Sequence, residues 1–200
     1  MKKKIMTWAC ASAGSVLAVV TMQSPDAPSI SAMTSSASAD QTLVISGEGL
    51  DGSMLHIQTD SRAFDLEPWM SASNRMLAVL PPNLEESVLA VWPVKDGLYG
   101  EPFYVNAAEV WWTYPSRVNA ADGTAVSVKL VGRNLKLNGF SPMLHLSGNG
   151  VEQDLNVTAQ NPYVLEAMLP SELSPGTYQL IAHNGSGGGI GWSAPIGSDG

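Results

Sequence analysis

The sequence predicts an all-β protein: two tandem Ig-like β-sandwiches after an N-terminal signal peptide. Two observations lead to this prediction. Short runs with apolar, β-branched or aromatic residues at alternate positions recur along the chain, and turn-forming pairs such as Asp51-Gly52 and Asn138-Gly139 separate them. The runs also repeat in the same order in both halves of the chain. Strands of this length, without intervening helices, are typical of a β-sandwich.

The composition is that of a folded protein with an acidic surface. Of the 200 residues, 44% are hydrophobic and only 14% are charged, which is enough apolar material for one large core or two smaller ones. The formal net charge of −8 repels phosphate backbones and anionic membrane surfaces. We therefore expect no nucleic-acid partner.

The N-terminus has the pattern of an export signal. Lys2, Lys3 and Lys4 precede an apolar, small-residue stretch over 5–22, and no basic cluster follows it. We assign residues 1–27 to a signal peptide and short linker, with cleavage after Ala39 as the alternative and a retained anchor as the less favoured one. The only cysteine, Cys10, lies inside the signal, so the mature chain has no disulfide. These features indicate a secreted bacterial protein with no stable membrane insertion after cleavage.

An internal repeat divides the chain. Landmarks of the first half return 85 to 91 positions later: 43–50 at 128–135, 54–58 at 143–147, 77–92 at 166–182 and 100–105 at 191–196. This predicts a degenerate domain over 28–106 and a second copy over 107–197, with 198–200 as a linker or the truncated start of a following domain. The match also makes 27–33 the first strand of the first copy, which cleavage after Ala39 would remove.

The second copy resembles a known family. The stretches "YPSRVNAADGTAVSVKLVGRNL" and "MLPSELSPGTYQLIAHNGSGGG" resemble the opening and the close of IPT/TIG-type Ig-like domains. The resemblance covers 110–196. The first copy is degenerate, because "EESVL" over 85–89 stands where the family has Pro-Gly-x-Tyr.

A closer resemblance is to a region of a particular class of secreted bacterial proteins. The stretches "AEVWWTYPSRVNAADGTAVSVKLVGRNL" and "NPYVLEAMLPSELSPGTYQLIAHNGSGGGIGWSAPI" are similar to the N-terminal accessory region of secreted bacterial pectate-lyase-like proteins. In those proteins a parallel β-helix follows and carries any polysaccharide-cleaving site. The resemblance implies a non-catalytic module, a polysaccharide as possible partner, and a C-terminal β-helix domain in a longer chain. It transfers no catalytic residue.

The glycine motifs do not indicate nucleotide binding. Residues 47–52 satisfy G-x-G-x-x-G, but a strand pattern follows where a dinucleotide site needs a helix. Residues 185–191 lack the Gly-Lys-Ser/Thr of a P-loop. We predict that this second stretch is a mobile turn over 184–189, between a strand over 177–183 and a closing strand over 190–196. No cofactor is expected.

The histidines and carboxylates do not form a recognisable catalytic or metal site. His56 and His145 occupy equivalent positions of the repeat, and with His183 they have no zinc-site spacing. Asp60 and Asp65, with nearby Glu67, are the densest carboxylates but lack the oxygen spacing of a calcium loop. No G-x-S-x-G elbow occurs. We expect no catalytic residue, no metal site and no enzymatic activity.

The aromatic residues are the candidate binding residues. Trp111, Trp112 and Tyr114 cluster at the start of the second copy, and Trp192 follows the glycine-rich stretch. Neighbouring residues of a strand face opposite ways, so one of the two adjacent tryptophans should be buried. The exposed ring could stack on a sugar, or the pair could seal the junction between the two domains.

The function that the sequence favours is therefore non-catalytic. We expect an accessory or spacer module of a secreted bacterial carbohydrate-active protein, with weak glycan contact. A cell-surface adhesion or protein-binding module is one alternative. The other is the N-terminal fragment of a polysaccharide lyase or glycoside hydrolase whose β-helix lies beyond this chain.

Overall fold

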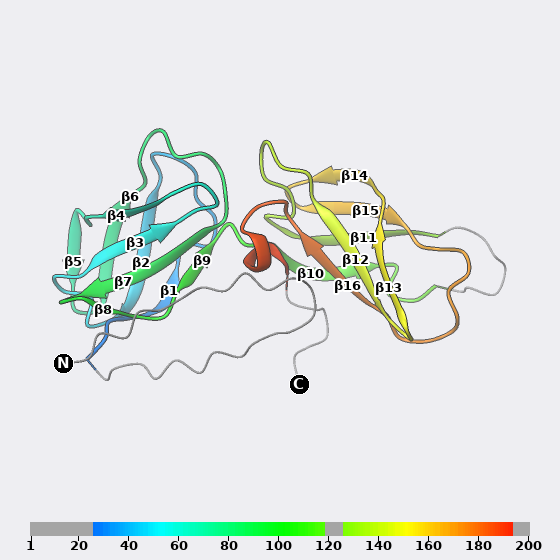
Figure 1. Cartoon of the computed structure of the whole chain (residues 1–200), viewed down its shortest axis with the longest axis horizontal. Coiled ribbons are helices and arrows are strands. Elements are labelled where there is room, and N and C mark those ends of the chain that lie inside the picture. The colour runs from blue at the N-terminus through cyan, green and yellow to red at the C-terminus, as the bar shows by residue number, and fades with distance from the viewer. Residues whose placement is uncertain (1–25, 119–125, 194–200) are drawn as a thin grey trace.

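The computed structural model describes residues 26–118 and 126–193, and in them the protein is all-β, as predicted (Figure 1). Sixteen strands form four antiparallel sheets, and one short 3-10 turn, η1 (Gly188–Gly191), lies near the end of the described chain. No helix in these two stretches has the length and apolar character needed to cross a membrane. Residues 1–25, which make up most of the predicted signal peptide and linker over 1–27, and residues 194–200 lie outside the described residues.

The first nine strands form the first sheet pair. One sheet has the order β1-β2-β6-β5; the other has the order β4-β3-β7-β8, with β9 also paired to β7. The bounds are β1 (Ser29–Met33), β2 (Thr42–Glu48), β3 (Met54–Gln58), β4 (Ala63–Leu66), β5 (Met70–Ala72), β6 (Arg75–Val79), β7 (Leu89–Lys95), β8 (Leu98–Tyr99) and β9 (Phe103–Val105).

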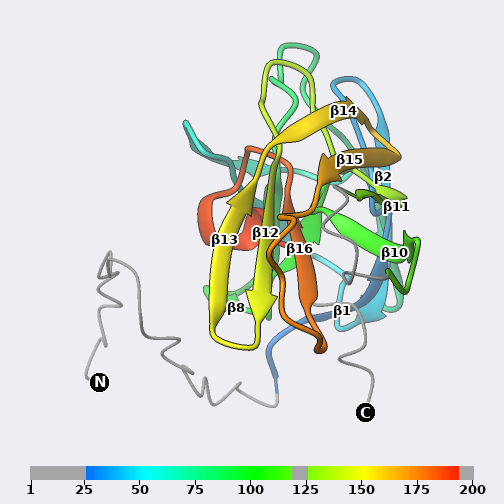
Figure 2. The ribbon, with the colours of Figure 1, turned by 90° about the vertical axis from the view of Figure 1, so that its right-hand side faces the viewer.

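The other seven strands form the second sheet pair, with the orders β10-β11-β15-β14 and β13-β12-β16. Figure 2 looks onto this pair, with β12, β13 and β16 on one side and β10, β11 and β15 on the other. The bounds are β10 (Glu109–Tyr114), β11 (Ser127–Arg133), β12 (Met143–Gly148), β13 (Val151–Leu155), β14 (Val157–Asn161), β15 (Val164–Met168) and β16 (Gln179–His183).

Each sheet pair encloses its own apolar core, because alternate residues of its strands point inward. In β2, Leu43 and Ile45 are fully buried while Val44 between them is exposed. The first core joins such residues from β2, β3, β6 and β7, and the second joins those from β11, β12, β15 and β16. The outer faces of the sheets are therefore left for solvent or partners.

The glycine-rich stretch differs from its prediction. Instead of a closing strand from residue 190, the chain makes the turn η1, because Gly187 and Gly188 adopt positive φ and the Ile190 amide donates to the Gly187 carbonyl. His183 also contacts the Gly188 carbonyl oxygen through Nε2 at 2.7 Å. Only the bridge between His183 and Trp192 resembles strand pairing here.

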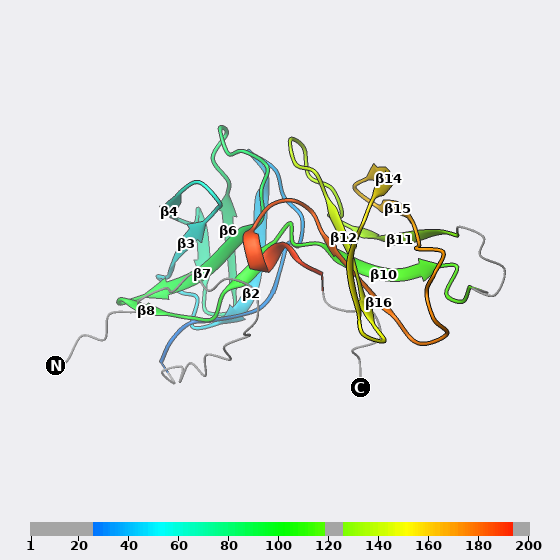
Figure 3. The same ribbon diagram turned by 45° about the vertical axis from the view of Figure 1, so that its right-hand side comes forward.

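The same stretch joins the two sheet pairs (Figures 1 and 3). The Asp60 carboxylate accepts hydrogen bonds from the Ser186 hydroxyl and the Gly187 amide. The Asn184 side chain donates to the Asn106 carbonyl at 2.8 Å, and Asn184 and Ser186 are buried. Further hydrogen bonds across the junction are Val88–Ser186, Arg133–Ser35, Asn134–Ser36 and Asn138–Glu86. The turn is thus a contact between the sheet pairs.

Candidate functional site: an aromatic face on strand β10

A β-bulge in β10 determines where the two adjacent tryptophans point. Val110 lies opposite Gly132 of β11 and Trp112 lies opposite Val131, so Trp111 has no partner residue. At a bulge two residues oppose one, which disturbs the alternation of side chains and allows neighbours to share a face. Gly132 is required for the close approach, because a Cβ there would lie 2.0 Å from the carbonyl oxygen of Glu109.

The structure corrects the prediction that one tryptophan is buried. Trp111 is 47% exposed and Trp112 is 53% exposed. Their ring centroids lie 5.9 Å apart with the planes tilted by 34°, so the two indoles lie side by side on the outer surface. Neither ring is buried, so the strict alternation expected for these two neighbours does not hold.

Tyr114 belongs to the same surface. Residues directly opposite one another in an antiparallel sheet share a face. Trp112 is opposite Val131 and Tyr114 is opposite Lys129, which is opposite Glu166 of β15. We define the aromatic face by its three exposed rings and the adjacent ion pair: Trp111, Trp112, Tyr114, Lys129 and Glu166. Tyr114 is 69% exposed.

Two carboxylates are held as anions here: Glu166 within the aromatic face and Glu109 beside it. Glu109 accepts the Trp111 Nε1–H at 2.8 Å and the Arg133 Nε–H at 2.8 Å. Partial burial raises the pKa of Glu109, but these hydrogen bonds and the charge of Arg133 outweigh it, and the pKa lies below its ordinary value. Both contacts orient the Trp111 indole and the carboxylate together.

Glu166 is a hydrogen-bond acceptor at neutral pH for the same reason. The Ser127 hydroxyl donates to it at 2.6 Å, and Lys129 Nζ lies 3.3 Å from its other oxygen. The hydrogen bond from Ser127 and then that from Lys129 lower the pKa of Glu166. A general acid near pH 7 needs a raised pKa, so neither carboxylate of this region has that property.

Trp192, the fourth predicted binding residue, lies elsewhere. It packs on the outer side of the sheet β13-β12-β16, with its ring centroid 4.8 Å from that of His183 and 6.3 Å from that of His145. It is 36% exposed. The structure therefore brings together three of the four predicted aromatic residues and places Trp192 on the other sheet of the pair.

The histidines lie on strands, as expected, and two of them contact an aspartate nine residues further along the chain. His56 Nδ1 lies 2.7 Å from Asp65, and His145 Nδ1 lies 2.7 Å from Asp154. His183 is buried against η1. Within 26–118 and 126–193, no three histidine, cysteine or carboxylate side chains gather to hold a metal ion. Asp60 and Asp65 bind different partners, so they form no calcium cluster.

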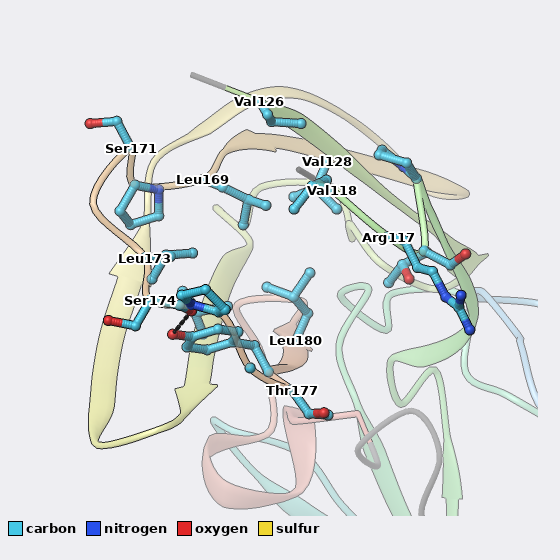
Figure 4. Close-up of a pocket in the computed structure, with 18 residues that line it drawn as sticks. Arg117, Val118, Val126, Val128, Leu169, Ser171, Leu173, Ser174, Thr177 and Leu180 are labelled. Atoms are coloured by element: carbon cyan, nitrogen blue, oxygen red, sulfur yellow. Dashed lines mark hydrogen bonds between the residues drawn. The ribbon is translucent and has the colours of Figure 1, made fainter. Parts of the chain in front are cut away.

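A hollow of about 500 Å³ opens at the end of the second sheet pair (Figure 4). Its wall is both polar and apolar, and Val128, Leu169 and Leu180 on its apolar side continue the core. The Tyr178 hydroxyl donates to the Ser174 carbonyl at 2.8 Å. Among its described lining residues there is no carboxylate or histidine. Its polar lining consists of hydroxyl side chains such as Ser174 and Tyr178, together with Arg117.

Sequence reasoning missed two features of this region. The bulge has no sequence signature beyond Gly132, which also fits an ordinary Gly turn. Tyr163 is 63% exposed, and its carbonyl accepts the Gly132 amide at 2.9 Å, which places it beside the bulge. Tyr163 lies in a turn between β14 and β15, where no spacing in the sequence relates it to Trp111.

No protein-family model matches the chain, and no curated protein matches it. Solved structures are similar at low identity. The surface glycan-binding protein SGBP-B of the mixed-linkage glucan utilization locus of Bacteroides ovatus, in complex with a mixed-linkage heptasaccharide, is 20% identical, with a TM-score of 0.30 over 80% of this chain and 40% of that chain. The surface glycan-binding protein PbSGBP-B of Prevotella bryantii is 14% identical, with a TM-score of 0.33 over 80% of this chain and 40% of that chain.

A third similar structure comes from an animal protein. The FN1–FN3 domains of chicken CNTN1 are 13% identical, with a TM-score of 0.30 over 86% of this chain and 63% of that chain. This chain spans about two fifths of the length of the two glycan-binding proteins.

Proposed function

We propose that this chain is a non-catalytic module of a secreted bacterial carbohydrate-active protein, and that its aromatic face contacts a neutral polysaccharide. In this proposal, 28–106 and 107–197 are two copies of one Ig-like domain of IPT/TIG type. A β-helix domain in a longer chain is the partner that the motif resemblance suggests. The junction around Asn106 and Asn184 supports a spacer with a fixed geometry.

The observation that carries the proposal is a comparison of the two copies. β1 has the same bulge as β10: Ile30 lies opposite Gly47 and Ala32 lies opposite Ser46, which leaves Ser31 without a partner. A Cβ at Gly47 would lie 1.8 Å from the Ser29 carbonyl oxygen, the same close approach as at Gly132. The first copy therefore builds this bulge with small residues.

Ser31 and Ala32 stand at the positions that Trp111 and Trp112 occupy in the second copy. Because the fold forms the bulge without large side chains, folding does not explain the two tryptophans. Exposing two indoles to water costs free energy that burial would recover. We infer that a partner covers them.

The chemistry of the face suits a neutral sugar chain. Aromatic faces carry partial negative charge and accept the polarised C–H groups of a sugar ring, while ordered polar groups at the rim bind its hydroxyls. Lys129 and Glu166 supply a donor and an acceptor beside the rings. The net charge of −8 disfavours strongly anionic polymers.

The test compares the full chain with the double variant Trp111→Ser/Trp112→Ala, which gives the second bulge the residues of the first. Isothermal titration calorimetry with cellohexaose, xylohexaose and mannohexaose should show binding by the parent to at least one of them. Stacking of a nucleobase on an aromatic side chain is worth about 1–3 kcal/mol. Taking the lower end of that range for each sugar–indole contact, we expect the double variant to bind at least tenfold more weakly.

Trp69→Ala is the matched control, because Trp69 is 65% exposed but lies in the first sheet pair. It should bind like the parent. The thermal midpoint of the double variant should stay within a few degrees of the parent's. Equal binding by all three proteins, or no binding by the parent to any of the sugars, would contradict the proposal.

A further inference from the structure

A groove runs between the outer face of the first sheet pair and the turn η1. Its volume is about 430 Å³, and its lining joins β3, β7 and β9 to the glycine stretch: Gln58, Ala90, Trp92, Tyr104, Gly188 and Gly189. It belongs to neither the aromatic face nor the hollow of Figure 4.

Strand register explains the shape of the groove. Ala90 of β7 lies between Gln58 of β3 and Tyr104 of β9, directly opposite both. Its small side chain is nearly covered and makes a low floor, while Gln58 and Tyr104 rise on either side. Trp92, two residues further along β7, faces the same way and closes one end.

The opposite wall is fixed in place. The Asp60 carboxylate binds the Ser186 hydroxyl and the Gly187 amide, and a Cβ at Gly187 would lie 2.8 Å from the Val88 Cβ. By contrast, a Cβ at Gly188 or Gly189 would meet no atom within 4 Å. The backbone at Gly187, just before η1, thus packs closely on the sheet, and the first two glycines of η1 leave the space in front of them open.

The groove offers the groups that a sugar site needs. The Trp92 ring is supported by His56, with centroids 5.9 Å apart, and the Tyr104 ring is 39% exposed. Burial raises the pKa of Tyr104, so its hydroxyl remains a neutral donor across the physiological range. Gln58 adds an amide that both donates and accepts, and Asp60 adds an acceptor and disfavours anions.

We propose that this groove is a second saccharide subsite, which takes one or two residues of a neutral glycan between Trp92, Tyr104 and η1. The choice of ligand class rests on the proposed function. The location of the subsite does not depend on the proposed function, because the groove contains none of the residues of the aromatic face and is lined by both sheet pairs. A concave site with two aromatic walls and a few polar groups is the usual form of a small-ligand site.

The test blocks the groove without disturbing the backbone. Gly189 lines the groove, has ordinary backbone φ and has open space at its Cβ, so the fold has room for the added bulk of Gly189→Phe at the groove wall, and Gly189→Ala is the matched control. Tyr104→Ala removes one wall as a second, independent variant. Each change is made in the full chain and in the Trp111→Ser/Trp112→Ala background, and calorimetry uses the same three hexasaccharides.

We expect residual binding in the Trp111→Ser/Trp112→Ala background that Gly189→Phe and Tyr104→Ala weaken at least tenfold, while Gly189→Ala changes it less than threefold. Unchanged binding by Gly189→Phe and Tyr104→Ala would overturn the proposed subsite but would not affect the proposal for the aromatic face. If binding is lost in these two variants but is unchanged in Trp111→Ser/Trp112→Ala, the subsite stands and the proposed role of the aromatic face is overturned. No binding by any of the proteins would overturn both.

Discussion

Asn106 holds the end of the first sheet pair against the second, and its replacement by alanine should be strongly destabilising. Its side-chain oxygen accepts the Ala37 amide at 2.9 Å, and its amide donates to the Ala37 and Ser87 carbonyls at 2.8 and 2.9 Å. Its own carbonyl accepts from Asn184. All of these residues are nearly inaccessible, with Asn106 4% exposed, and Asn106 has a φ of +63°.

The magnitude follows from these contacts. Asn106→Ala leaves three buried backbone groups without partners, at about 1 kcal/mol each as a lower figure. A left-handed conformation costs alanine about 1 kcal/mol more than asparagine, whose side chain tolerates it. We therefore expect the free energy of unfolding to fall by about 4 kcal/mol. Asn106→Gly removes the same hydrogen bonds but tolerates the backbone, so it should lose about 3 kcal/mol.

Urea unfolding followed by tryptophan fluorescence measures both variants. The lost hydrogen bonds and the backbone strain are separate costs, so the two variants can be told apart. Asn106→Ala must have a lower free energy of unfolding than Asn106→Gly, and both must be well below that of the parent. A loss under about 1 kcal/mol for Asn106→Ala would refute the reasoning, since the hydrogen bonds would then contribute little. Full stability of Asn106→Gly would show that backbone strain alone matters.

Two further predictions concern the second sheet pair. Gly132→Ala should lower the free energy of unfolding by about 3 kcal/mol in a urea titration, because its Cβ would collide with the Glu109 carbonyl oxygen; stability equal to the parent's would contradict the bulge. Hydrogen bonds to Asp154 and then Glu152 raise the pKa of His145, so its contribution to stability is full below the ordinary histidine pKa and is lost as pH rises through the raised value. Asp154→Asn should lower the NMR titration midpoint of His145; an unchanged midpoint would contradict this assignment.

The fold class could be predicted because it depends on local patterns. Alternation of buried and exposed residues in stretches such as β2 and β11 predicts the strands, and the structure pairs β1 with β2 and β10 with β11. His56 and His145, which occupy similar sequence contexts, each contact an aspartate nine residues later. These features can be predicted from local sequence patterns, without knowing how the sheets pack against one another.

The arrangement of the site could be predicted only in part. Trp111, Trp112 and Tyr114 lie on one surface, but strict alternation put the two tryptophans on opposite faces, and only the pairing with β11 reveals the extra residue at Trp111. The sequence predicts a closing strand where η1 lies, because Asp60, which holds Ser186 and Gly187 just before η1, lies more than a hundred residues away along the chain. Contacts between the sheet pairs have no local signal in the sequence.

The central claim is that Trp111 and Trp112 contact a neutral glycan. The most direct measurement is NMR of the indole N–H groups in the 15N-labelled full chain, titrated with whichever hexasaccharide the parent binds. The indole resonances of Trp111 and Trp112 should shift in a saturable way, while that of Trp69 stays in place. Saturable shifts confined to other tryptophans, or no shift at all, would contradict the claim.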